Sequence, residues 1–165
     1  MRPEIQWSPG VLLYLAALLL TLPWQWIASA IAAICIHELC HAGVALVLGY
    51  PIWRFCVGFS GVKMETSPME PLHELLCALA GPLGGLLTLP FARIIPGVCV
   101  CAAIHTLYNL LPIYPSDGGR ALLCAARLLF PEKVAFAMEQ VPVVQNFSLA
   151  DVMEADLAAR EAASR

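Results

Sequence analysis

Charge is what this sequence has least of. Only 13% of its 165 residues are charged and 60% are hydrophobic, whereas a soluble domain carries about 25% charged and about 45–50% apolar residues. The formal net charge of −3 offers no basic surface to attract nucleic acid. A disordered chain would be far poorer in apolar residues. The composition therefore excludes an ordinary soluble domain, a disordered chain and a nucleic-acid-binding protein.

Long stretches without Asp, Glu, Lys or Arg are the main positive feature. Residues 5–36, 75–92 and 94–116 contain none of these four residue types. Because about 20 mostly apolar residues span a bilayer, the sequence predicts an all-α polytopic membrane protein with four to six transmembrane helices. Helices are expected over residues 8–24, 26–48, 72–91, 94–111 and 117–130.

One stretch between the predicted helices has a different composition. Residues 51–65 nearly alternate aromatic or β-branched residues with polar ones, around a Gly-Phe-Ser-Gly turn at residues 58–61. This pattern predicts a short membrane-associated β-hairpin. After Pro131 the chain becomes polar, so we expect a membrane-embedded domain over residues 1–130 and a short soluble helical tail over residues 131–165.

The sequence gives little support to a cysteine-based metal or redox motif, or to a cleaved signal peptide. The seven cysteines include no paired CxxC motif, so the sequence predicts neither a zinc ribbon nor a thioredoxin motif. Residues 28–30 have the small-x-small form of a signal-peptide cleavage site. Cleavage there would remove the first turns of the helix over residues 26–48, so we expect that the N-terminal helices are retained.

The motif His37-Glu38-Leu39-Cys40-His41 lies within the second predicted helix. Histidines at positions i and i+4 project from one helical face and can bind one metal ion, with the glutamate beside them. Glu38 is the only acidic or basic residue between Glu4 and Arg54. An ionisable residue in an apolar span costs at least about 2.5–3.5 kcal/mol, so a functional role is expected. The alternative is a hydrogen-bonded trio with a purely structural role.

A catalytic zinc ion usually has three protein ligands and one open position, and this motif supplies two. Cys40 points about 100° away from His41 on the helix, so it cannot easily share the ion. Asp117 opens a helix after a break that contains two prolines, where it could be a ligand or an ordinary N-cap. The residues alone leave open a choice among Cys40, His73, Glu74, His105 and Asp117.

Three separated elements resemble the site-2 protease family of intramembrane zinc metalloproteases. They are the HELCH motif, the Ala80-Gly81-Pro82 segment with Gly85, and the later Asn-x-x-Pro-x-x-x-x-Asp-Gly pattern, in the expected order. The chain lacks a PDZ insertion and has Ser116 where the family often has Leu, so it resembles a minimal, sporulation-type form. The resemblance implies one Zn²⁺ per chain, with Glu38 as general base, Asn109 near the substrate or transition state, and ligands His37, His41 and Asp117.

The same resemblance implies a function. We expect hydrolysis of peptide bonds within transmembrane segments of membrane-tethered proteins, in a multi-pass protein of the bacterial plasma membrane. A strand edge within residues 53–59 or 61–65 is hypothesised to pair with the unwound substrate. The partners are then a transmembrane substrate and the bilayer, with homo-oligomerisation left open. The alternatives are a non-proteolytic metal-binding transporter or sensor that uses His37, His41 and His105, and a catalytically inactive scaffold.

Overall fold

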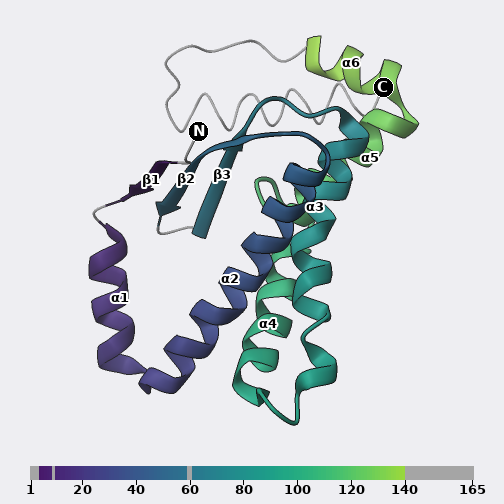
Figure 1. The fold of residues 1–165 in the computed structure, drawn as a ribbon. Helices are drawn as coiled ribbons and strands as arrows, with labels where there is room; N and C mark the ends of the chain where they lie inside the picture. Colours follow the sequence, from purple (N-terminus) through teal and green to yellow (C-terminus); the bar gives the residue numbers. More distant parts are fainter. Residues whose placement is uncertain (1–3, 9, 59–60, 140–165) are drawn as a thin grey trace.

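The computed structural model describes residues 4–8, 10–58 and 61–139 of the chain (Figure 1). Most of this part is helical, with one small mixed sheet. The elements are, in order, β1 (Glu4–Trp7), α1 (Gly10–Thr21), α2 (Trp24–Val47), β2 (Ile52–Gly58), β3 (Gly61–Thr66), α3 (Pro71–Leu86), the 3₁₀ turn η1 (Leu89–Phe91), α4 (Pro96–Asn109), α5 (Asp117–Leu129) and α6 (Pro131–Glu139).

The five predicted helices are all present. The third ends earlier than predicted, at Leu86, and gives way to η1. Pro90 lies in η1 and has no N–H to continue an α-helical ladder, which accounts for the early end. The soluble tail remains a prediction, because only its first helix, α6, lies within the described residues, and residues 140–165 do not.

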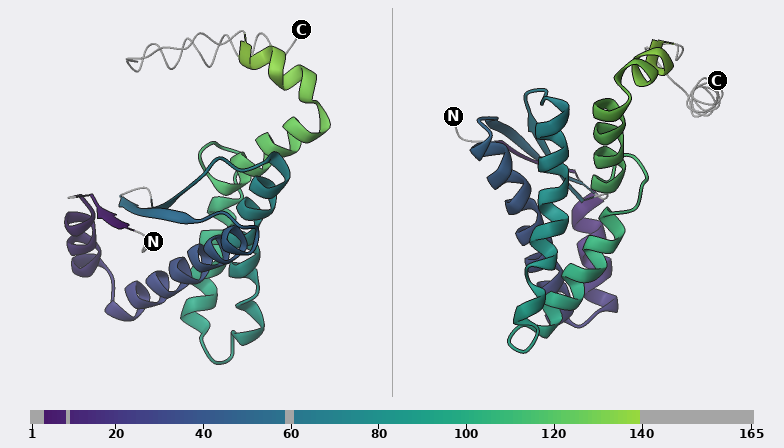
Figure 2. Two further views of the ribbon diagram at one scale, coloured as in Figure 1. Left: turned by 45° about the horizontal axis from the view of Figure 1, so that its top comes forward. Right: turned by 90° about the vertical axis from the view of Figure 1, so that its right-hand side faces the viewer.

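Helices α2, α3 and α4 pack together, and α5 packs on α3 (Figures 1 and 2). Small residues make this close packing feasible. A Cβ added at Gly84 would overlap Cys40 Sγ, and one at Gly85 would overlap Thr106 Oγ1. Most of the buried apolar side chains are alanine and cysteine, whereas many leucines lie on the outside. Contacts between small residues are typical of helices that approach closely in membrane proteins.

Two segments among the described residues are long and apolar enough to cross a membrane. They are α2, with 24 residues, and the 21-residue segment Pro71–Phe91, which joins α3 to η1. Helix α1 is apolar but has only 12 residues. In Figure 1 the helices α1 to α4 alternate in direction, with the sheet and α6 at one end of the bundle. The three-stranded sheet and α6 therefore lie at the same end of the helix bundle.

The predicted hairpin is confirmed, and a strand that was not predicted extends it to three strands. β2 pairs antiparallel with β3, and β1 pairs in parallel with the other side of β2. The sheet order is β1-β2-β3, so β2 is central and has no free edge. The expectation that an edge within residues 53–59 could pair with substrate is therefore wrong, and β3 is the part of the hairpin whose outer edge stays unpaired among the described residues.

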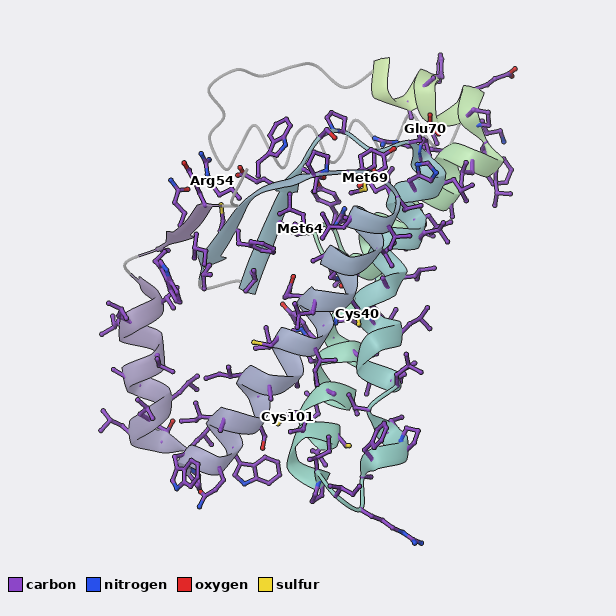
Figure 3. The ribbon with its side chains drawn as sticks, in the orientation of Figure 1. Cys40, Arg54, Met64, Met69, Glu70 and Cys101 are labelled. Atoms are coloured by element: carbon purple, nitrogen blue, oxygen red, sulfur yellow. The ribbon has the colours of Figure 1, made fainter. Side chains whose placement is uncertain are left out.

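The two faces of the sheet differ in polarity because alternate residues of a strand point to opposite faces. Arg54 on β2 lies 3.4 Å from Glu4 on β1 and 3.3 Å from Glu65 on β3, measured between guanidinium nitrogen and carboxylate oxygen. In Figure 3 Arg54 lies away from the helices, whereas Met64 on β3 lies near the sheet end of α2. The less polar face therefore covers one end of the helix bundle.

Candidate metal centre

Three potential ligand atoms converge where α2 meets the start of α5. His37 Nε2 lies 2.9 Å and His41 Nε2 lies 3.2 Å from Asp117 Oδ2, and the two Nε2 atoms are 3.0 Å apart. All three residues are buried. Ligands about 2.0–2.2 Å from a tetrahedral zinc ion are themselves roughly 3.3 Å apart. The donor types and their spacing therefore fit one zinc ion.

The hydrogen bond at the other ring nitrogen of His41 determines which nitrogen carries the proton. His41 Nδ1 lies 2.6 Å from the backbone carbonyl oxygen of Cys77 on α3. Because a carbonyl only accepts, Nδ1 must carry the proton, which leaves the lone pair of Nε2 directed at the cluster. Metal-binding histidines usually make such a second hydrogen bond, which orients the ring.

Gly81 on α3 forms the wall against which both imidazoles pack. A Cβ at this position would overlap Nε2 of His41 and Nε2 and Cε1 of His37. The sequence marked this glycine only as part of a small-residue pattern. Its contacts show that the absence of a side chain leaves room for the two ring nitrogens to converge.

Gly81→Ala should therefore displace the imidazoles and lower zinc affinity by at least about tenfold, the lower end of the losses seen when groups that orient ligands are changed. The matched control is Gly43→Ala, because a Cβ at this exposed glycine of α2 meets nothing within 4 Å. Zinc per chain after dialysis against a buffered zinc series measures the effect. Equal zinc retention in the two variants would show that Gly81 does not shape the site.

Asp117 is free to face the histidines because its neighbour caps the helix. Ser116 is the N-cap of α5, and its side chain accepts a hydrogen bond from the Gly119 amide at 3.4 Å. The N-cap alternative for Asp117 is therefore wrong. A Cβ at Gly118 would overlap the Leu110 carbonyl, so this glycine allows the start of α5 to lie against the preceding loop. Ser116, the departure from the family pattern, thus has a local structural role.

The other candidate ligands have different partners. His73 Nδ1 lies 2.9 Å from the Tyr50 hydroxyl, and Glu74 Oε1 lies 3.4 Å from Arg120 Nη2. Cys40 packs beside Gly84 between α2 and α3 (Figure 3). His105 contacts the His37 ring edge-on, with centroids 4.6 Å apart, but contributes no ligand atom to the group. Among the described residues, the structure adds Asp117 to the two motif histidines.

A cavity of about 410 Å³ opens beside the three residues. Glu38 and Asn109 line it, together with Val62, Met64 and Thr66 of β3. The Asn109 amide nitrogen lies 3.0 Å from both the backbone oxygen and Nε2 of His105, so both of its hydrogens have acceptors. Its remaining polar atom, Oδ1, can only accept. Asn109 thus lines the cavity with an acceptor available rather than a donor, and its position near the substrate or transition state stays a prediction.

One cavity residue was not identified from the sequence. Arg120 follows Asp117 by three positions on α5 and lines the same cavity. The spacing of three on a helix is the signal that could have found it, since such residues share a face. The expected helix start at Asp117 was sufficient to place both side chains together.

Comparisons with known proteins bear on this arrangement. No family model matches the chain. Stage IV sporulation protein FB of Bacillus subtilis (strain 168) is 34% identical over an alignment of 142 positions, and the match covers 69% of this chain and 48% of that protein. The chain thus spans about half the length of this curated relative. The structure of the Site-2 Protease from Methanocaldococcus jannaschii superposes with a TM-score of 0.63 at 17% identity, covering 97% of this chain and 88% of that one. The structural match confirms the fold that the resemblance to the site-2 protease family implies.

Proposed function

We propose that this chain, which shares the fold of a site-2 protease, is an intramembrane zinc metalloprotease that cleaves transmembrane segments of membrane-tethered proteins. The observation that carries the proposal is the convergence of His37, His41 and Asp117 beside Glu38 at one cavity. Two histidines and a carboxylate are a ligand set of catalytic zinc sites, and an adjacent glutamate supplies a base.

The chain's own residues account for the proton transfers of peptide hydrolysis. A zinc ion held by His37, His41 and Asp117 would supply Lewis-acid activation of water and of the scissile carbonyl. Glu38 takes a proton from the attacking water as the new C–O bond forms, and returns it to the leaving amine as the C–N bond breaks. Glu38 lines the cavity of about 410 Å³, where we propose that water and the substrate meet it.

The exposed surface of the helices supports a multi-pass position in a cell membrane. Large apolar side chains such as Leu13, Leu20 and Val47 are 77%, 89% and 87% exposed, which suits contact with lipid rather than water. We propose that α1 to α4 make four passes through the hydrocarbon layer. Because α1 is only about 18 Å long, it would need its flanking residues or a locally thin bilayer to complete a pass.

Chelation of the metal tests the proposal directly. The purified protein, reconstituted with a fluorescently labelled transmembrane peptide, should cleave it, lose that activity in phenanthroline and regain it with added zinc. Cys40→Ala should behave like the wild type in the same assay, because Cys40 packs against α3 and has no role in the mechanism. Chelator-resistant cleavage that the Cys40 change removes would indicate a cysteine enzyme instead.

β3 is the element that we propose holds the substrate. An unwound transmembrane segment exposes amides that need partners where water is scarce, and a free strand edge supplies them by β-augmentation. The outer edge of β3 is unpaired among the described residues, and Val62, Met64 and Thr66 place one of its faces at the cavity.

Proline substitution along β3 should therefore reduce cleavage at alternate positions, because a strand directs successive N–H groups to opposite sides and proline removes the donor. Alanine at each position is the control and should cost much less. Initial cleavage rates and zinc content of each variant give the comparison. Similar mild effects of proline and alanine at every position would show that β3 only anchors the bundle.

A further inference from the structure

Among the Asp, Glu, Lys and Arg residues found to line the cavity in the described part of the chain, Arg120 is the one that the proposed mechanism does not use. Its side chain is one-third exposed and lines the cavity beside Glu38 and Asp117. Of the described residues that line the cavity, it is the only lysine or arginine. In a chain with so little charge, an arginine next to the candidate metal centre costs free energy unless its charge is used or compensated.

Glu74 on α3 compensates part of this charge. A single contact of 3.4 Å joins Arg120 Nη2 to Glu74 Oε1, and the Glu74 side chain is 26% exposed. No other hydrogen bond to the guanidinium is found within the described part of the chain. A guanidinium has five N–H donors, so most of them have no acceptor among the described residues, and the residue lines the cavity.

The donors and acceptors around the cavity favour a carboxylate as the ligand of Arg120. Glu38 and Asp117 place negative charge near the metal centre, while the amide hydrogens of Asn109 are occupied by His105. Arg120 is therefore the strongest hydrogen-bond donor on this part of the wall. The planar guanidinium fork matches a carboxylate in a two-point, charge-assisted hydrogen bond.

We propose that Arg120 binds a carboxylate group of the peptide in the cavity, a role that rests on the proposed protease function. Two sources present this group. One is the C-terminal carboxylate that cleavage creates on the departing fragment, and the other is an acidic side chain of the substrate near the scissile bond. Glu74 positions the guanidinium from behind and leaves its cavity side to the ligand.

A thermodynamic cycle isolates this contact. Calorimetric titrations of the zinc-loaded full chain in detergent would use the tripeptide acetyl-Leu-Ala-Leu with a free carboxylate and the same peptide as its carboxamide. Arg120→Gln should weaken binding of the carboxylate form at least about tenfold, as expected for one charge-assisted hydrogen bond. Binding of the carboxamide should change much less. A second pair of peptides, the carboxamides of acetyl-Leu-Glu-Leu and acetyl-Leu-Gln-Leu, tests whether an acidic side chain supplies the carboxylate.

Glu74→Gln separates ligand binding from a merely structural clamp between α3 and α5. A clamp requires both partners, so the two variants would then show the same loss of thermal stability and neither would alter the preference for a carboxylate. In the proposed role, Glu74→Gln keeps the preference and Arg120→Gln removes it. Arg120→Lys should retain part of it, because lysine keeps the charge but not the fork.

Phenylglyoxal labelling of the wild type provides a measurement that needs no variant. The carboxylate peptide should slow the modification of Arg120 and leave exposed Arg93, outside the cavity, unchanged. An equal carboxylate preference in wild type and Arg120→Gln for both peptide pairs, or labelling of Arg120 that neither pair slows, would overturn the proposal. These readouts need no cleavage, so failure of the protease function and failure of this site are distinguishable.

Discussion

Glu38→Gln should leave the protein folded and zinc-loaded but remove its peptidase activity. The side chain has nearly the same size, yet an amide cannot take the proton from the attacking water. Loss of a general base typically costs about 10²–10⁴-fold in rate. The ligands His37, His41 and Asp117 are unchanged, so zinc per chain and the unfolding temperature should stay close to those of the wild type.

The matched control is Glu132→Gln, the same chemical change on exposed α6 and outside the cavity. Both variants would be assayed for initial rates on the labelled transmembrane peptide, with zinc measured in the same samples. Comparable activity of the Glu38 and Glu132 variants would contradict a glutamate-based mechanism. A Glu38 variant that loses zinc would instead indicate that Glu38 belongs to the ligand set.

The helices could be predicted because each depends mainly on local composition. Apolar stretches with few or no charges located α1 to α4, and prolines and glycines marked most helix ends to within a few residues, apart from the end of α3. β1 could not be predicted in this way. It has four residues, and its pairing joins Glu4 to Arg54 fifty positions later, a contact that no local pattern contains. Without β1, β2 seemed to have a free edge.

The candidate site was predictable where one helix contains it. His37, Glu38 and His41 follow from helical periodicity alone. Whether Asp117 is a ligand or an N-cap could be decided only from the structure. There, Ser116 is the N-cap of α5 and the Asp117 carboxylate lies against His37. The role of Gly81 required tertiary packing, because it depends on the His37 and His41 rings that lie opposite it on α2. Helical spacing could have placed Arg120 beside Asp117, but its contact with Glu74 on α3 could not be predicted from the sequence.

Asp117→Ala and His105→Ala should separate the third ligand from a neighbour of the site. Both side chains lie against His37, but only Asp117 places a ligand atom, Oδ2, within 3.2 Å of both histidine Nε2 atoms. Asp117→Ala should reduce zinc affinity by more than the roughly 10–100-fold typical of outer-shell partners, and activity should fall with it. His105→Ala should keep close to one zinc per chain.

Zinc content and thermal unfolding of both purified variants decide the question, because helix α5 should survive the loss of Asp117. Its cap, the Ser116 side chain with the Gly119 amide, is untouched, so a loss of zinc in Asp117→Ala would reflect the missing ligand rather than an unravelled helix. Asp117→Asn keeps the shape and should still lose affinity, since the anionic donor is gone. The opposite pattern, with zinc lost in His105→Ala and retained in both Asp117 variants, would move the third ligand to α4 and favour the three-histidine arrangement.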